Sequence, residues 1–395
     1  MTKLDNPYLT DQLIPYIGNK RKLLPLVHKA INQTGVKSGI FFDVFAGSGV
    51  VSRLAKSAGL QVIANDWEPY CEILNKVYIS MNHPPAFANF GGIKNAIDTL
   101  NELSGQAGYI AGHYCPADDE AYDDATERMF YTQSNGRRID AIREQIADWK
   151  ESGKIDEYEE AALLAPLIYQ ASYCSNTSGV FKGFHRGWGG ATKTAHYRIL
   201  SNLNLSVPVF YNNNQDNQVH RVDASKLAEE IECDIAYLDP PYNQHQYGSN
   251  YHLLNTVALW DKPQISKLIS INGERDKAAI RKDWRTQRRS AYCYKSSALK
   301  AFQELVSKLK ARYILVSYST DGIIELPDLL SCLNERGDLS VVLKQYKRYR
   351  VSSQRPSLRP HTTEFVAIVD THKASQPHNI EQIIKEIQDS EERSI

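Results

Sequence analysis

The segment Ile235-Ala236-Tyr237-Leu238-Asp239-Pro240-Pro241-Tyr242 decides the fold that the sequence predicts. Its first four residues are mostly apolar, which is typical of a buried strand, and the prolines end that strand because proline has no backbone N–H. Open α/β sheets bind ligands at the carboxyl ends of their strands. A stiff turn there can direct carbonyl oxygens, one carboxylate and one aromatic ring towards a flat base with an exocyclic amine. The purely structural alternative is a strand end followed by a proline turn and a core tyrosine.

The composition is that of a globular protein with room for a large core. The 395 residues include 42% hydrophobic residues, and 46 basic residues balance 46 acidic ones. This length predicts two domains or one domain with a large insertion. Six widely spaced cysteines without a CxxC pair argue against zinc and disulfides and favour buried thiols. We find no secretory signal or apolar run of about 20 residues, so we expect a cytoplasmic protein without a membrane span.

A second α/β signal lies near the amino end of the chain. An apolar strand from Gly39 to Asp43 leads through Phe45 into the turn Gly47-Ser48-Gly49, and a helix is predicted from Val50 to Ala58. A second strand is predicted from Gln61 to Asp66, whose terminal carboxylate suits a ribose diol. The third glycine of the dinucleotide fingerprint is missing, because Ser52 stands in its place. These residues alone leave open a dinucleotide site and an adenosyl-methionine site.

Residues 81–215 interrupt the alternating βα pattern. Helices are predicted from Arg137 to Trp149 and from Asp156 to Ser172, and an acidic loop from Asp118 to Glu127. The following stretch, 179–198, mixes glycines, aromatic residues and cations, which favours contact with a nucleic acid over a plain surface loop. Together with the basic stretches 277–300 and 344–359, it supplies the candidate DNA-binding residues, which are Lys182, His185, Arg186, Trp188, Lys193 and Arg289.

The βα pattern resumes after the interruption. Strands are predicted at Val207–Tyr211 and Ala311–Tyr318. A helix is predicted at Ser297–Lys310, between the Asp239–Tyr242 turn and the strand at Ala311–Tyr318. A closing antiparallel pair is predicted from Tyr346 to Val351 and from Glu364 to Val369. We expect the polar tail after residue 371 to fray, apart from a weak amphipathic pattern near Ile380.

The ordered motifs resemble a known family. The set is Tyr16-Ile17-Gly18-Asn19-Lys20, then Asp43-Val44-Phe45-Ala46-Gly47-Ser48-Gly49, a long insert, and Asp239-Pro240-Pro241-Tyr242. It resembles the N6-adenine DNA methyltransferases of the Dam-like (alpha) motif order, and the continuation to Asn255 looks like the subgroup that accompanies FokI-type restriction systems. The resemblance covers most of residues 13–370 and implies a Rossmann-like, seven-stranded methyltransferase sheet with an inserted, mainly helical target-recognition domain.

The resemblance implies a role for each matching residue. Asp239, Pro240 and Tyr242 would hold the flipped target adenine, with Tyr247 to Tyr251 facing the same pocket or the flanking strand. Asp66 would bind the cofactor ribose, Trp67 would lie beside the cofactor adenine, and Asp223 would accept from its amino group. The other residues implied in binding S-adenosyl-L-methionine are Tyr16, Gly18 and Lys20 at the methionyl end, and Asp43, Phe45, Gly47, Gly49 and Ala224 around the rest.

The implied organisation has a first methyltransferase part at 1–80, a recognition insert at 81–215, a second part at 216–371 and a tail at 372–395. We expect a monomer that binds double-stranded DNA, with a possible cognate restriction endonuclease and no metal. The alternatives are an N4-cytosine or RNA adenine methyltransferase, a nicotinamide-dependent oxidoreductase and a silent DNA-binding protein. Cytosine-C5 chemistry is disfavoured because the sequence has no Pro-Cys dipeptide to supply a thiolate.

Overall fold

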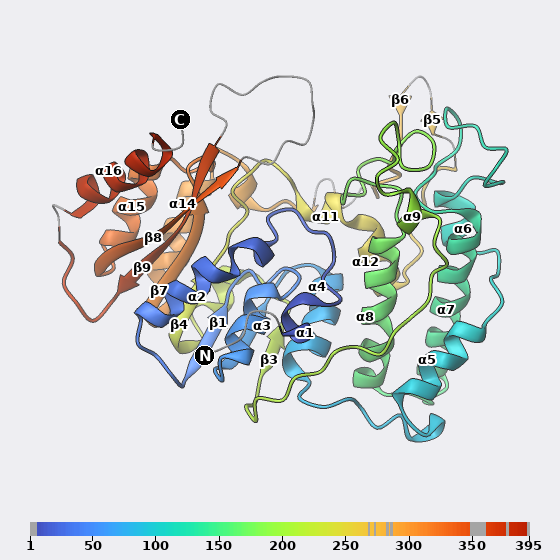
Figure 1. Ribbon diagram of the computed structural model, residues 1–395, viewed down its shortest axis with the longest axis horizontal. Coiled ribbons are helices and arrows are strands. Elements are labelled where there is room, and N and C mark those ends of the chain that lie inside the picture. Colours follow the sequence, from blue (N-terminus) through green and yellow to red (C-terminus); the bar gives the residue numbers. More distant parts are fainter. Residues whose placement is uncertain are drawn as a thin grey trace.

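A seven-stranded mixed sheet forms the centre of the computed structural model, which describes residues 6–267, 269–271, 274–281, 284, 287–347, 361–376 and 379–392 (Figure 1). The strand order is β3-β2-β1-β4-β7-β9-β8, and only β9 runs antiparallel to its neighbours. The strands are β1 (Ile40–Asp43), β2 (Gln61–Asn65), β3 (Gln218–His220), β4 (Glu232–Leu238), β7 (Lys310–Ser319), β8 (Asp338–Lys347) and β9 (His361–Asp370). The Rossmann-like α/β prediction is therefore confirmed.

Strands β1 and β4 meet where the direction of winding reverses. They are parallel neighbours, with Phe41 opposite Ile235 and Asp43 opposite Tyr237. The chain continues from β1 to β2 on one side and returns to β4 on the other, so the carboxyl ends of β1 and β4 border one crevice. This register brings the glycine turn and the proline corner to the same edge of the sheet.

Helices cover both faces of the sheet. Alternate residues of each central strand point to opposite sides, as the pleat requires, so Phe41 and Ile235 join one apolar cluster and Phe42 and Ala236 join the other. The first face carries α1 (Pro7–Thr10), η1 (Lys20–Leu23), α2 (Leu24–Gln33) and α3 (Val50–Ser57). The second carries α10 (Ala224–Leu227), α14 (Ala298–Lys308), α15 (Leu326–Asn334) and α16 (Asn379–Glu392).

A helical layer beside the sheet contains the inserted segment (Figure 1). Thr132 caps its longest helix, and a capping box at Asp156 and Glu159 begins the next, as the polar residues before each apolar run allow. The helices are η3 (Ala88–Phe90), α5 (Ile93–Glu102), α6 (Tyr109–Tyr114), α7 (Gln133–Glu151), α8 (Glu157–Tyr173) and α9 (His196–Ile199). A small hairpin, β5 (Ser270–Ile271) and β6 (Glu274–Arg275), lies on the same side of the molecule.

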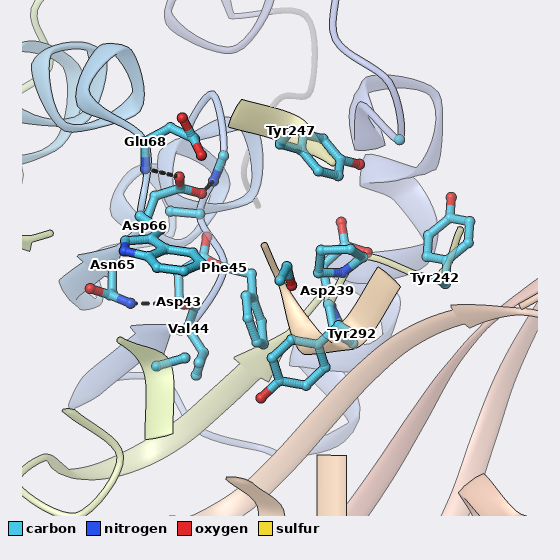
Figure 2. A pocket seen from close by; sticks show the side chains of 18 of the residues that line it. Asp43, Val44, Phe45, Asn65, Asp66, Glu68, Asp239, Tyr242, Tyr247 and Tyr292 are labelled. Atoms are coloured by element: carbon cyan, nitrogen blue, oxygen red, sulfur yellow. Dashed lines mark hydrogen bonds between the residues drawn. The ribbon is translucent and has the colours of Figure 1, made fainter. Parts of the chain in front are cut away.

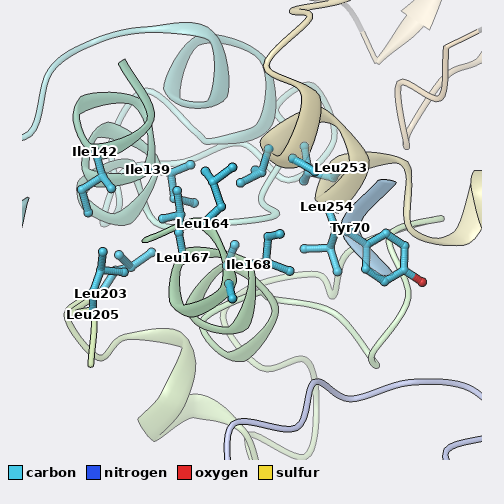
Figure 3. Packing of buried hydrophobic residues seen from close by; sticks show 14 of the residues in the cluster. Tyr70, Ile139, Ile142, Leu164, Leu167, Ile168, Leu203, Leu205, Leu253 and Leu254 are labelled. Carbon is cyan, nitrogen blue, oxygen red and sulfur yellow. The ribbon is translucent and has the colours of Figure 1, made fainter. Parts of the chain in front are cut away.

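The insert shares its core with four elements that lie outside residues 81–215. These are α4 (Pro69–Asn75), the π-helical turn η2 (Lys76–Ser80), α11 (Tyr247–Asn250) and α12 (His252–Leu259). Figure 3 shows Leu164 and Ile168 of α8 packed between Ile139 of α7 and Leu254 of α12, with Tyr70 of α4 beyond. Because this core extends across residues 81 and 215, the insert packs directly against α4, η2, α11 and α12. The proposed domain limits themselves stay a prediction.

Two strand predictions and one tail prediction differ from the structure. Val207–Tyr211 is not a strand, because the side chain of Gln12 bonds the Val207 carbonyl and the Val209 N–H. The edge strand is β3 instead. The predicted strand from Tyr346 begins earlier, as β8 at Asp338, and residues 348–360 lie outside the described part of the chain.

The expected fraying of the tail is wrong for residues 379–392, whereas the amphipathic pattern near Ile380 is confirmed. They form α16, and Ile383 and Ile387 are buried against the sheet cluster on its second face. The buried-thiol prediction is confirmed, since all six cysteines are free and buried. Among the described residues, none of the helices is both long and apolar enough to cross a lipid bilayer.

Candidate active site

One cavity lies at the carboxyl edge of β1, β2 and β4, with a volume of about 410 Å³. This volume lies within the range that small-molecule sites occupy. Figure 2 shows Asp43 at the end of β1 and Phe45 just after it, Asp66 and Glu68 after β2, and Asp239 and Tyr242 after β4, all around the same space. Of the residues expected to bind cofactor or target base, the cavity is lined by Tyr16, Gly18, Lys20, Asp43, Phe45, Gly47, Asp66, Trp67, Asp223, Ala224, Asp239, Pro240 and Tyr242.

Tyr251, one of the residues expected to face the pocket, stacks on Tyr16 and does not line the cavity. Gly49 does not line the cavity either. It begins α3 with φ +78°, and a Cβ there would lie 2.4 Å from Asn75 Oδ1. The same Asn75 side chain donates to the carbonyl of Gly47 at 3.0 Å. Gly49 therefore shapes the turn from behind, because only glycine permits both this backbone conformation and this close approach.

Asp66 joins the glycine turn after β1 to the loop after β2. Its carboxylate accepts from the N–H of Gly47 at 2.8 Å and from the N–H of Glu68 at 2.9 Å (Figure 2). Burial raises the pKa of this carboxyl, and the backbone N–H groups oppose that rise. Asp66 thus holds the loop after β1 against the loop after β2, a role that the sequence did not predict.

Asp43 offers an unsatisfied acceptor at the floor of the cavity. Its side chain is 1% exposed, and Ser52 Oγ donates to Oδ2 at 2.6 Å. The other oxygen, Oδ1, has no hydrogen-bond partner among the described residues. Burial raises the pKa of Asp43 to about 7, with the nearby charges of Asp239 and Asp66 adding to the effect and the Ser52 bond opposing it.

A buried ion pair fixes the catalytic corner. Lys20 Nζ lies 3.1 Å from Asp239 Oδ1 and 4.9 Å from the centre of the Tyr242 ring, and only 3% of Lys20 is exposed. Burial disfavours the ammonium, but Asp239, Tyr242 and Glu364 outweigh it, so the pKa of Lys20 is raised. Burial also raises the pKa of Asp239, against the lowering effect of Lys20. Lys20 and Asp239 therefore keep each other in position at the DPPY turn.

The segment before Lys20 is clamped to the segment after the DPPY turn. The hydroxyl of Tyr251 accepts from the N–H of Ile17 at 2.8 Å, and the hydroxyl of Tyr247 donates to the Ile17 carbonyl at 3.2 Å. Tyr16 stacks on Tyr251 with ring centres 5.0 Å apart. This packing explains how residues so distant in sequence bring Lys20 to Asp239.

Several residues of the cavity were not predicted. Glu68 accepts from Asn255 Nδ2 at 2.5 Å, and Arg288 donates to the Trp67 carbonyl at 2.7 Å. Tyr292 packs edge-on against Phe45 with ring centres 5.2 Å apart. Glu68 had a signal, because it follows Asp66-Trp67 directly. Arg288 lies in the basic stretch 277–300, but neither it nor Tyr292 had a signal for this cavity, since only tertiary folding brings the 288–292 segment over it.

The expected DNA-binding residues fall into two groups. Lys182, Arg186 and Lys193 are exposed on the glycine-rich segment 179–193, whereas His185 and Trp188 are half-buried. The Trp188 indole donates to the Asp119 carbonyl at 2.9 Å. Burial lowers the pKa of His185. Arg289 lies at the cavity itself, away from the rest of the set in sequence and on its own segment.

The chain belongs to the D12 class N6 adenine-specific DNA methyltransferases, whose family model matches residues 16–321. It is 32% identical to the type II methyltransferase M.NlaIII of Neisseria lactamica over 90% of this chain and 98% of that protein. It is 33% identical to the type II methyltransferase M.FokI of Planomicrobium okeanokoites over 88% of this chain and 51% of that protein. It is 31% identical to the modification methylase StsI of Streptococcus sanguinis over 85% of this chain and 48% of that protein.

These relatives confirm the resemblance found in the sequence. The chain spans nearly all of the first relative and about half the length of the other two. Membership of an adenine-specific DNA methyltransferase family argues against the oxidoreductase alternative, which the Gly47-Ser48-Gly49 turn had left open. The family also favours adenine N6 over cytosine N4 as the methylated atom.

Proposed function

We propose that this chain transfers a methyl group from S-adenosyl-L-methionine to N6 of an adenine that is flipped out of double-stranded DNA, as the modification enzyme of a restriction-modification system. The observation that carries the proposal is the single cavity that contains both the Asp43–Gly47 turn and the Asp239–Tyr242 corner. A methyl group can pass between two ligands only if their sites open into one another. Parallel pairing of β1 and β4 provides that opening.

The hydrogen-bond acceptors and apolar walls of the cavity fit S-adenosyl-L-methionine. The unpaired Asp43 Oδ1 is a buried acceptor, Asp223 offers a second carboxylate, and Phe45 and Tyr292 provide apolar walls for a flat ring. When bound, the cofactor supplies an electrophilic methyl group on a sulfonium. Asp43, Asp66, Trp67 and Asp223 would hold it, while the N–H of Gly47 stays engaged with Asp66 and keeps the turn in shape.

The target base would be held by the DPPY corner. An adenine amine is a weak nucleophile because its lone pair is delocalised into the ring. Asp239 and the Pro240 carbonyl would accept its two N–H bonds and draw the nitrogen towards tetrahedral geometry. Tyr242 would stack on the base and offset part of the few kcal/mol that flipping costs. These residues act by orientation and by stabilising the charge that develops on nitrogen, and the surplus proton leaves to water.

The glycine-rich segment is the proposed DNA contact nearest the target base. The N–H of Phe181 donates to the Asn250 carbonyl at 2.7 Å, and His252 Nε2 bonds the Phe181 carbonyl at 3.0 Å. These bonds fasten the segment directly behind the DPPY continuation. Lys182 is exposed next to Phe181, and its charge acts on His245, three residues after Tyr242. It would there contact the phosphates of a flipped nucleotide.

Cofactor affinity should rise with pH because of Asp43. With a pKa of about 7, this carboxyl is mainly protonated at pH 6 and mainly ionised at pH 8. Since the ionised form accepts more strongly from an amino group, we expect affinity for S-adenosyl-L-methionine to increase by about tenfold between these pH values. Calorimetric titration at each pH measures this change. Asp43→Asn should bind weakly without the pH dependence, and an unchanged slope in that variant would remove Asp43 from the cofactor site.

The exposed cations should set the salt dependence of DNA binding. We expect the double variant Lys182→Ala, Arg186→Ala to bind DNA more weakly, with the slope of log K against log salt reduced by about two, because each lost phosphate contact removes about 0.9. Fluorescence anisotropy across a salt series measures the slope. The matched control is Lys29→Ala, Lys37→Ala, two exposed lysines near α2 and remote from the insert. Equal slopes in both double variants would contradict the assignment.

A further inference from the structure

A second carboxylate shares the catalytic lysine. Glu364 lies on β9, opposite Ser319 of β7 and Lys344 of β8, at the end of the sheet that faces the DPPY corner. Its Oε2 is 3.9 Å from Lys20 Nζ, and the Glu364 side chain is 11% exposed. No described residue donates a hydrogen bond to that oxygen. One buried ammonium therefore stands between two carboxylates, Asp239 at 3.1 Å and Glu364 at 3.9 Å.

The proposed reaction requires Asp239 to change partners. In the protein alone its Oδ1 is turned to Lys20, whereas the proposed chemistry needs the same carboxylate to accept from the target amine. If Lys20 had only Asp239 as a counter-charge, moving Asp239 towards the base would leave a buried ammonium unpaired, which is costly. Glu364 offers Lys20 a second acceptor 3.9 Å away, from strand β9.

We infer that Glu364 is a positioning residue for methyl transfer: by sharing the charge of Lys20, it leaves the Asp239 carboxylate available to the target amine. This inference rests on the proposed function. Glu364 touches neither the cofactor site nor the base site; it does not line the cavity. Its effect reaches the reaction through Lys20 and through its charge near Asp239, so it should change the rate and pH profile of methyl transfer without changing cofactor affinity.

The charged surroundings give the direction of the pH effect. Burial raises the pKa of Glu364, Lys20 lowers it, and Asp239 and Asp321 raise it. Removing the negative charge of Glu364 leaves all of the Lys20 charge to Asp239, so the pKa of Asp239 should fall. Several titratable and charged groups surround the two carboxylates Asp239 and Glu364. They are Lys20 of η1, Tyr237 of β4, Tyr242 after β4, Asp43 of β1, Tyr247 of α11 and Asp321 after β7.

The test is single-turnover methyl transfer by Glu364→Gln, with enzyme in excess over an adenine-containing duplex. We expect the rate to fall by about 10-fold to 100-fold, as for other residues that orient a reacting group. We also expect the acid limb of the pH–rate profile to move to lower pH, and the cofactor dissociation constant to stay unchanged. The matched control is Glu335→Gln, the same chemical change at an exposed position beside α15.

Two results would overturn the inference while leaving the proposed function intact. One is a wild-type rate and an unmoved acid limb in Glu364→Gln; the other is a loss of cofactor affinity that accounts for the whole rate change. If wild-type protein itself fails to methylate adenine, the proposed function fails first. If Glu364→Gln does not fold, Glu364→Asp is the second variant, because it keeps the negative charge but moves it further from Lys20. A reduced rate with a smaller shift of the acid limb supports the inference. A wild-type pH–rate profile contradicts it.

Discussion

The variant Asp239→Ala should lose methyl transfer by at least about 10³-fold while still binding S-adenosyl-L-methionine. The alanine removes the acceptor that would orient the target amine and stabilise its developing charge, a type of contribution that is typically worth about 10²-fold to 10³-fold for one group and more when positioning is lost as well. Asp43, Asp66 and Asp223 remain, so the cofactor half of the cavity is unchanged. Transfer of labelled methyl to DNA and cofactor titration measure the two quantities separately.

A suitable control removes a carboxylate elsewhere. Asp328→Ala alters an exposed residue in the first turn of α15 and should leave both quantities unchanged. Asp239→Asn keeps one oxygen acceptor and should retain more activity than the alanine variant. Substantial turnover by Asp239→Ala would mean that another group orients the amine, and the chemistry proposed for the corner would have to be abandoned.

The second large effect is expected for Lys20→Met. This change leaves Asp239 and Glu364 buried without their shared counter-charge, and removing one partner of a buried pair typically costs about 3 to 5 kcal/mol of unfolding free energy. Activity should also be lost, because Asp239 would then be held protonated. Denaturant unfolding at pH 7 measures the loss of stability. Lys22→Met, an exposed lysine in the same turn, is the control and should change stability little.

The stability loss in Lys20→Met should depend on pH in a fixed direction. Burial raises the folded-state pKa of Asp239 and of Glu364, so the folded protein holds protons that the unfolded chain releases near pH 4. Where the folded state binds more protons, stability falls as pH rises. Without Lys20 both pKa values should rise further, and the deficit should widen from about pH 4 towards neutral pH. A deficit that shrinks over this range would contradict the shared ion pair.

The central part of the fold was predictable because local signals agreed with the sheet. The run Ile235–Leu238, the glycine turn, the amphipathic α7 and the largely apolar α8 each show a sequence pattern that agrees with their burial. The edge strand β3 was not, because Gln218–His220 is short and partly exposed, whereas the more apolar Val207–Tyr211 bonds the side chain of Gln12. For α16 the local signal was only the weak amphipathic pattern near Ile380, because the burial of this helix depends on its packing against α15 and β8.

The candidate site was predictable where motifs are local and not where tertiary packing completes them. Asp43, Asp66 and Asp239 end strands, so their place at one edge of the sheet follows from the βα pattern. The internal role of Asp66, which binds Gly47 and Glu68, appears only once both loops are seen together. Tyr292 and Glu364 come from segments without a motif, and they reach the site through the 288–292 segment and the antiparallel strand β9.

The most direct test of the central claim is mass spectrometry of nucleosides from duplex DNA incubated with the protein and S-adenosyl-L-methionine. One rigid corner, with Asp239 beside the cofactor cavity, should yield N6-methyladenine with the wild-type chain and almost none with Asp239→Ala. Methylation of cytosine N4, or equal N6-methyladenine from both proteins, would contradict the account.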